Sequence, residues 1–227
     1  MTVEFDKVTI KFGDIVALDE VSFEIKPGEF VFITGPSGAG KTTIVRLILR
    51  EYSPTSGKIE IDGEDLSEIK TKNLPKLRQK IGVVFQDFKL LMDRTVRGNV
   101  ALTLRVIGKE EKEIEKEVTK ILKLVGLEER THLFPAQLAG GELQRAGLAR
   151  AVVGQPEIII ADEPTGNLDL ATSWQIIRLL QKINKMGKTV IMATHNFEIV
   201  NSMKERVIEF DKGKLISDKK KGKYKVR

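Results

Sequence analysis

The sequence contains no cysteine, which excludes disulfide bonds, thiolate chemistry and any metal site built on cysteine. It also lacks long hydrophobic runs, since no apolar stretch approaches the roughly 20 residues that a membrane-spanning helix needs. The N-terminal residues include neither a basic region nor a long apolar segment, so we expect no signal peptide. Together these absences fit a protein of the cytoplasm.

The chain has 227 residues, enough for one α/β domain with a substantial core or for a core with a subdomain. Its net charge of +6 is modest, and much of it lies near the C-terminus. Within residues 212–227, seven lysines and one arginine face a single acid, Asp218. A solvated, frayed end is the simple interpretation of this tail. Contact with anionic lipid or nucleic acid is the alternative.

One stretch, GPSGAGKT at residues 35–42, matches the phosphate-binding loop pattern G-x-x-x-x-G-K-[ST] at every fixed position. The apolar run at 30–33 predicts a buried strand before the loop, and residues 43–50 predict a helix after it. Glycines let successive N–H groups point at phosphate oxygens, and a helix N-terminus adds partial positive charge. An ordinary glycine-rich turn with a chance lysine is the alternative, but it does not account for the flanking elements.

The motif assigns a task to each of its polar residues. Lys41 supplies a positive charge for the β- and γ-phosphates, and the Thr42 hydroxyl is a magnesium ligand. We therefore predict that the chain binds a nucleoside triphosphate together with Mg²⁺. The predicted nucleotide-binding residues here are Gly35, Pro36, Ser37, Gly38, Ala39, Gly40, Lys41, Thr42 and Thr43.

Short apolar or alternating runs predict strands along much of the remaining chain. They lie at 8–12, 21–25, 58–61, 81–85, 157–161 and 189–193, with a closing hairpin at 206–210 and 214–216. A helix is predicted at 171–186. Between residues 87 and 156 the pattern turns helical, and the apolar residues of 110–125 fall on one face of a 3.6-residue period. We expect this region to be a helical subdomain inserted into a sheet-based core.

Polar side chains follow three separate predicted strands, namely Gln86, the pair Asp162 and Glu163, and His195. Ligands of open α/β sheets bind at the carboxyl ends of the strands, so we expect these groups to converge. Asp162 would hold the metal, directly or through water, and Glu163 would orient or deprotonate an attacking water. His195 would hydrogen-bond the γ-phosphate or that water. His132 has no such context and is expected at the surface.

A second glycine pair, Gly140 and Gly141, opens a predicted helix after the break at Pro135. Such a helix N-terminus makes another anion site. One chain does not need two phosphate sites for one nucleotide, and a dimer in which each pair closes the partner's site would explain it.

Taken together, these residues resemble an ATP-binding cassette (ABC) ATPase over nearly the whole chain. Residues 35–42 match the Walker A loop, 138–145 the signature motif, 158–162 Walker B and 167–169 the D-loop. Gln86, Glu163 and His195 match the Q-loop glutamine, the catalytic glutamate and the switch histidine. Residue type alone favours a core position for Phe12, but it stands where the family has an aromatic that stacks on adenine.

The resemblance implies an α/β P-loop NTPase fold with a RecA-like core, a mostly parallel sheet, an antiparallel β subdomain and an inserted helical subdomain. Residues 1–227 would form a single ABC domain, with 1–86 and 157–227 as the core and 87–156 as the helical subdomain. The activity implied is hydrolysis of ATP to ADP and phosphate by a head-to-tail homodimer around two Mg-ATP. Its metal ligands would be Thr42, Gln86 and Asp162. The residues that act in trans would be Ala139, Gly140, Gly141, Glu142 and Asp169.

A narrower match concerns residues 84–91, 93–96 and 99–102, which resemble the cell-division branch of the family. That branch implies a separate integral membrane partner, regulation of peptidoglycan hydrolysis and a peripheral location on the inner face of the membrane. Residues 164–169 also resemble lipoprotein-release and macrolide-export ATPases, which is the alternative. A soluble cassette protein acting on ribosomes or nucleic acid is an alternative of another class, although we expect no specific nucleic-acid partner.

The chain departs from the family pattern at Ala139, where serine is usual, at Leu143, where glutamine is usual, and at Asn196, often an aspartate. A serine would donate a hydrogen bond to the partner's γ-phosphate, which Ala139 cannot do. Losing one hydrogen bond to a charged group costs about 1.5–3 kcal/mol. We therefore expect ATP-driven dimerisation to be weakened but retained. For Asn196 we expect little effect on the chemistry.

Overall fold

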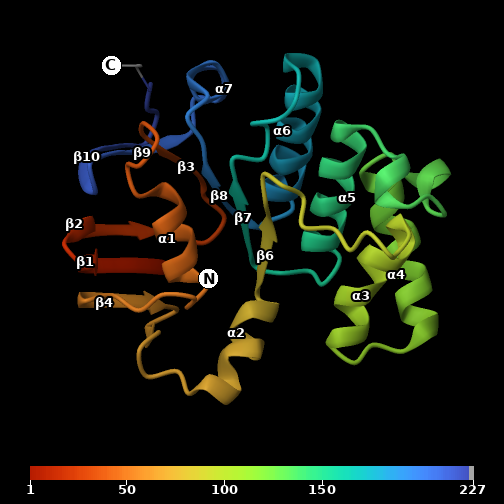
Figure 1. Cartoon of the computed structure of the whole chain (residues 1–227), viewed down its shortest axis with the longest axis horizontal. Coiled ribbons are helices and arrows are strands. Elements are labelled where there is room, and N and C mark those ends of the chain that lie inside the picture. Colours follow the sequence, from red (N-terminus) through yellow and green to blue (C-terminus); the bar gives the residue numbers. More distant parts are fainter. Residues whose placement is uncertain (225–227) are drawn as a thin grey trace. The chain divides into compact units, whose positions relative to one another are not determined.

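The computed structural model describes residues 1–224 and divides into two compact units. Unit 1 comprises Met1–Arg78 together with the chain from Asn184 onward, and unit 2 comprises Gln79–Ile183. Figure 1 shows the course of the chain through both units.

An antiparallel sheet in unit 1 has the strand order β2-β1-β4-β5. Its strands are β1 (Val3–Phe12), β2 (Ile15–Ile25), β4 (Ser56–Ile61) and β5 (Glu64–Asp65). β1 and β2 are longer than predicted, because register shifts interrupt their alternation between Phe5 and Val8. Lys7 and Glu20 have positive φ near these shifts, which hides the period-two pattern from the sequence.

The second group of strands in unit 1 is parallel, with β3 (Phe30–Thr34) in the middle. Every residue of β3 is buried. β3 pairs in parallel with β8 (Thr189–Ala193) on one side and β9 (Arg206–Asp211) on the other. The predicted closing hairpin is confirmed, since β10 (Lys214–Lys219) pairs antiparallel with β9. Positive φ at both turn residues, Lys212 and Gly213, is typical of a two-residue hairpin turn.

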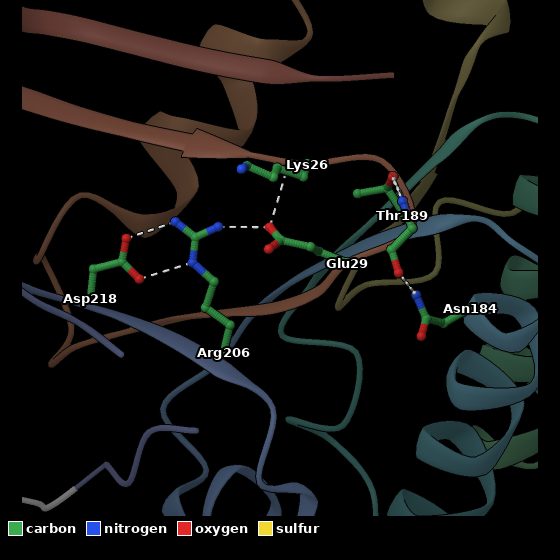
Figure 2. A network of polar contacts seen from close by, with 7 residues as sticks. Lys26, Glu29, Asn184, Thr189, Arg206 and Asp218 are labelled. Atoms are coloured by element: carbon green, nitrogen blue, oxygen red, sulfur yellow. Dashed lines mark hydrogen bonds and ion pairs between the residues drawn. The ribbon is translucent and has the colours of Figure 1, made fainter. Parts of the chain in front are cut away.

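The turn before β3 is fixed by the polar network in Figure 2. Arg206 donates to Glu29 at 2.6 Å and makes two bonds to Asp218 at 2.9 and 2.7 Å. The hydrogen bonds to Asp218 are the largest cause of the raised pKa of Arg206. The Gly28 N–H donates to the Thr189 hydroxyl, so the starts of β3, β8 and β9 are tied together.

The C-terminal segment is solvated as predicted, but through residue 224 it is not frayed. β10 continues to Lys219, and the Gly222 N–H donates to the Glu205 carbonyl. The buried side chain of Tyr224 anchors the segment, and its N–H donates to the Asn201 side chain at 2.8 Å. The last residues of the predicted tail, 225–227, lie outside the described residues.

The helices of unit 1 are short. They are α1 (Lys41–Ile48), α2 (Leu74–Gln79), α7 (Phe197–Met203) and a 3-10 turn, Thr71–Asn73. α1 begins two residues before the predicted start. α2 and α7 were not predicted, because six or seven residues are too few for a helical period to show.

Unit 2 begins with β6 (Ile81–Val84), which pairs in parallel with β7 (Ile158–Asp162). Between these strands lie α3 (Val96–Val106), α4 (Glu111–Leu124), α5 (Gly140–Val152) and the 3-10 turns Glu128–Arg130 and Pro135–Gln137. After β7 comes α6 (Leu170–Lys185), one residue earlier than predicted at each end.

The helices α3, α4 and α5 share one apolar core and lie side by side in Figure 1. On α4 the predicted apolar face is confirmed: Ile114, Val118 and Leu122 are buried in this core and Ile121 packs against it. The opposite face of α4 is mostly Lys and Glu. Within residues 1–224, no helix combines the length and apolar character needed to cross a membrane.

Candidate active site

The loop after β3 follows the glycine pattern closely. Gly35, Gly38 and Gly40 have φ of 148°, 79° and 102°, values that favour glycine. A Cβ at Gly35 would collide with the Phe210 carbonyl oxygen, and one at Gly40 would lie 2.7 Å from a Leu18 methyl group. At Gly38 the space is open, so only its backbone conformation requires glycine. The loop is thus bent into a curve that ends at the N-terminus of α1.

The side chain of Lys41 lies against this loop. It is 9% exposed, and its Nζ donates to the carbonyl oxygens of Gly35 and Pro36 at 2.9 and 3.0 Å. These two bonds hold the ammonium group against the backbone of the loop. Lys41 is therefore held where it can reach an anion bound by the loop.

The same loop is braced by the β9–β10 turn. The Gly213 N–H donates to the Ala39 carbonyl at 3.3 Å, and the Gly213 carbonyl accepts from the Asp19 N–H of β2 at 2.9 Å. A Cβ at Gly213 would lie 2.7 Å from the Ala17 carbonyl oxygen. Sequence reasoning assigned nothing to this glycine beyond its turn.

His195 lies at the same edge of unit 1 as the phosphate-binding loop. β3 and β8 are parallel with Ile33 opposite Ala193, so Gly35 and His195 each stand two residues past a paired position. The His195 side chain is exposed. The next residue, Asn196, caps α7 by accepting from the Ile199 N–H at 3.2 Å. Asparagine and aspartate cap helices about equally well, which agrees with the small effect expected at this position.

Phe12 ends β1 at the tip of the β1–β2 hairpin, where its side chain is 44% exposed. The core position favoured by residue type alone is therefore wrong, because the tip extends past the buried layer. Its ring makes an edge contact with Tyr52 at 5.1 Å between centroids. The Tyr52 hydroxyl accepts from Arg46 of α1 at 2.6 Å. This exposed, supported ring fits a stacking role, and no sequence pattern pointed to Tyr52.

In unit 2, Gln86 and Glu163 leave adjacent strands at one edge. Val84 of β6 lies opposite Ala161 of β7, and each polar residue stands two positions further on. Asp162 is the last residue of β7 and is half-buried. Glu163 has φ of 46°, a left-handed conformation that costs a non-glycine residue about 1–2 kcal/mol. The chain thus turns sharply out of the strand at the predicted catalytic residue.

The side chain of Gln86 rests on the loop that follows β7. Its Nε2 lies 3.5 Å from the Asn167 Oδ1, and the Asn167 Nδ2 lies 3.5 Å from the Gln86 carbonyl oxygen. A Cβ at Gly166 would lie 3.0 Å from the Gln86 amide nitrogen. The structure therefore places Gln86 beside the residues that connect Glu163 with Asp169.

The N-terminus of α5 is capped from one side only. The Glu142 Oε2 accepts from the Ala139 N–H at 3.0 Å, and the Glu142 Oε1 accepts from Arg130 at 3.0 Å. Ala139 stands at the N-cap and has no side-chain acceptor to offer in return. Glu142, predicted to act in trans, is thus engaged within its own chain.

Asp169 likewise has a role in its own chain. It accepts from the Thr172 N–H at 2.9 Å and from the Thr172 hydroxyl at 2.6 Å, which caps α6. A Cβ at Gly141 would collide with the Thr172 methyl group. The glycine that opens α5 therefore lies against the cap of α6, a link that the sequence did not reveal.

The cap formed by Glu142 gives a prediction for acid stability. Hydrogen bonds from the Ala139 N–H and from Arg130 lower the pKa of Glu142 below its usual range. A lowered folded-state pKa contributes stability that is present above about pH 4.3, the unfolded value, and is lost as pH falls through the folded pKa. We expect Glu142→Gln to be less stable than wild type at pH 7 and to lose less stability on acidification. Urea unfolding from pH 7 to pH 3 measures this, and equal slopes for both proteins would contradict it.

The candidate metal ligands are all oxygen donors: the Thr42 hydroxyl, the Asp162 carboxylate and the Gln86 amide oxygen. Oxygen donors suit Mg²⁺, which keeps several waters and usually binds one or two carboxylates together with substrate phosphates. Among the described residues, no group of three or more His, Cys, Asp or Glu side chains is arranged to hold a metal by itself. The donor set thus fits Mg²⁺ bound together with a nucleotide.

Comparison with known proteins identifies the family. A family model described as ABC transporter matches residues 18–166. The chain belongs to the ABC transporter family. It is 52% identical to the cell division ATP-binding protein FtsE of Bacillus subtilis over 92% of each chain. It is 44% identical to FtsE of Escherichia coli over 94% of this chain and 96% of that relative.

Among solved structures, this ABC ATPase resembles the dimeric post-hydrolysis state of the cassette MJ0796 bound to ADP and Pi. The TM-score is 0.88 at 38% identity, over 98% of this chain and all of that one. The predicted fold class is therefore confirmed. The protein is an FtsE-like ABC ATPase of the cell-division type, which binds and hydrolyses ATP.

Proposed function

We propose that this chain is the ATPase subunit of an FtsE-type complex, in which it drives a separate integral membrane protein of the FtsX type. In this role it lies on the inner face of the membrane. Its ATP-driven motion is transmitted through the membrane protein and regulates peptidoglycan hydrolases. The observation that carries the proposal is the near full-length similarity to FtsE proteins of several bacteria.

For hydrolysis, the loop from Gly35 to Thr43 and the ammonium group of Lys41 bind the phosphates, and Phe12 stacks on adenine. Glu163 orients or deprotonates the attacking water, and His195 hydrogen-bonds the γ-phosphate or that water. Thr42, Asp162 and Gln86 would hold the Mg²⁺, which would supply positive charge next to the phosphate oxygens.

The proposed active form is a head-to-tail homodimer around two ATP molecules. The N-terminus of the signature helix, α5, completes the nucleotide site of the other protomer. The residues that act there are Ala139, Gly140, Gly141, Glu142 and Asp169. The dimeric assembly of the MJ0796 cassette supports this arrangement. Within one ABC domain, residues 87–156 serve as the helical subdomain and residues 1–86 and 157–227 as the core.

The missing hydroxyl at position 139 leads to a testable result. We expect Ala139→Ser to tighten ATP-dependent dimerisation, because serine adds a donor toward the partner's γ-phosphate worth about 1.5–3 kcal/mol. Analytical ultracentrifugation with ATP, in the Glu163→Gln background, measures the dimer affinity.

Serine would also cap α5 and stabilise the monomer by about 1 kcal/mol. Urea unfolding without ATP measures this contribution. Because monomer and dimer share the cap, it does not by itself change the dimer affinity. Unchanged dimer affinity in the Ala139→Ser protein would show that position 139 does not face the γ-phosphate bound by the partner.

The segment after Gln86 is the proposed docking surface for the membrane partner. Asp87, Leu91, Met92 and Asp93 are exposed there, with Met92 61% exposed. Asp87 pairs with Lys89 at 2.6 Å, and Arg94 is also exposed, so charges of both signs surround the apolar Leu91 and Met92. Such a surface fits a partner that presents apolar groups together with complementary charges.

Co-purification tests the proposed function. The Glu163→Gln protein, purified with ATP from native membranes in mild detergent, should bring down an FtsX-type protein. The same protein with Asp87→Lys and Asp93→Lys should lose that partner yet still form the ATP dimer. Recovery of a transporter permease instead would indicate a role in export rather than in cell division. Recovery of ribosomal or nucleic-acid partners alone would contradict the membrane role.

A further inference from the structure

The segment that joins β6 to α3, residues 85–95, has no regular secondary structure. Its residues Phe88 and Lys89 have φ of 60° and 50°, two consecutive left-handed positions without glycine. Each such residue costs about 1–2 kcal/mol. Contacts with the rest of unit 2 must therefore hold this segment in its conformation.

Arg150, in the last turn of α5, makes the contact at this strained point. Its guanidinium donates to the Phe88 carbonyl at 3.1 Å and to the Lys89 carbonyl at 2.5 Å. Two N–H groups of one rigid, planar fork thus hold two consecutive carbonyls, whereas a lysine would have to bind both through one nitrogen on a flexible stem. Arg150 is half-buried, and burial lowers its pKa, although an arginine keeps its charge at neutral pH.

Two further side chains fasten the segment. Asn99 of α3 is fully buried, accepts from the Leu91 N–H at 2.8 Å and donates to the carbonyls of Leu91, Arg94 and Thr95. Gln144 of α5 donates to the Phe85 carbonyl at 3.4 Å. The backbone of the segment is therefore held by two helices, and α5 contributes at both Gln144 and Arg150.

α5 connects this segment with the signature motif. The helix is one continuous element of 13 residues that begins at Gly140. Because the helix is continuous, a shift or a rotation of α5 that moves its N-terminus can be passed along its length to Arg150. We propose that Arg150 is a positioning residue that couples the signature helix to residues 85–95, so that ATP-driven closure changes the segment that meets the membrane partner. The proposal rests on the dimer described under the proposed function.

Hydrogen–deuterium exchange with the full chain tests this coupling. In the Glu163→Gln background, ATP should change the exchange rate of peptides from 86–95 as well as peptides from the loop at 35–42. With Arg150→Met added, the ATP effect on 86–95 should shrink by about two- to thirtyfold, as coupling changes of 0.5–2 kcal/mol produce. The ATP effect on 35–42 should persist. A purely structural role would alter exchange equally with and without ATP.

Two further variants sharpen the test. Arg105→Met removes an exposed arginine of α3 that pairs with Glu111, and it should leave the ATP effect on 86–95 intact. Arg150→Lys keeps the charge without the fork and should give an intermediate loss. If Arg150→Met does not fold, Arg150→Lys alone tests whether Arg150 couples α5 to residues 86–95.

The outcomes separate the two proposals. A full ATP response of 86–95 in both Arg150 variants, with the dimer still formed, would overturn the coupling alone. A Glu163→Gln protein that stays monomeric with ATP would overturn the proposed dimer and the coupling with it. Loss of the 86–95 response only in the Arg150 variants would support both.

Discussion

In the Glu163→Gln protein, steady-state ATP hydrolysis falls by about 10²- to 10⁴-fold, the usual contribution of a general base. The amide keeps nearly the size and shape of the carboxylate, but it cannot accept a proton from water. The Walker B strand and the sharp turn at Glu163 are unchanged, so ATP should bind as before. Phosphate release measures the first effect, and equilibrium titration with ATP the second.

Because hydrolysis is blocked, the Glu163→Gln protein should also accumulate as an ATP-bound dimer. Gel filtration of Glu163→Gln with ATP should show a dimer that wild type forms only transiently. Glu157→Gln is the matched control, because Glu157 is an exposed acid just before the start of the same strand, β7. Hydrolysis by Glu163→Gln within tenfold of wild type would exclude Glu163 as the base.

In the Lys41→Met protein, ATP binding weakens by about 10- to 150-fold for each charge-assisted hydrogen bond that is lost. The Lys41 ammonium already lies against the loop through the Gly35 and Pro36 carbonyls, so little ordering is needed when phosphate binds. Isothermal titration calorimetry measures the affinity directly. The stabilisation by ATP, about 2.7 kcal/mol at a hundredfold excess over Kd, should fall in parallel.

Lys58→Met serves as the control for Lys41→Met. Lys58 is an exposed lysine of the antiparallel sheet that pairs with Glu60, and its loss should leave ATP affinity unchanged. Unfolding without ATP shows whether Lys41→Met is folded. A folded Lys41→Met protein with wild-type affinity would contradict the assignment of the loop.

The sequence predicted features that are encoded over a few neighbouring residues. The glycine loop with its flanking strand and helix, the apolar face of α4 and the buried strands around β7 and β8 all follow from local spacing. The placement of Gln86 beside the loop after Glu163 followed from one general rule about strand ends. The catalytic and metal-binding roles stay predictions.

What the sequence could not predict are contacts between residues far apart along the chain. Tyr52 beside Phe12, Thr172 against Gly141 and Arg150 on the Phe88 carbonyl depend on the completed fold. The position of Phe12 was misjudged from residue type, since hydrophobicity does not distinguish a core ring from a ring presented at a hairpin tip. The strands β1 and β2 were predicted too short, because bulges break the alternation on which strand prediction relies.

The brace at Gly213 has a consequence for the order of synthesis. A ribosome that has made the chain through Asp169 has produced the Walker A, signature, Walker B and D-loop motifs. At that point β3 still lacks both of its partners, β8 and β9, and the Ala39 carbonyl lacks the Gly213 N–H. The ATP-binding loop, encoded near the start of the chain, therefore reaches its final shape only after almost the whole protein has been translated.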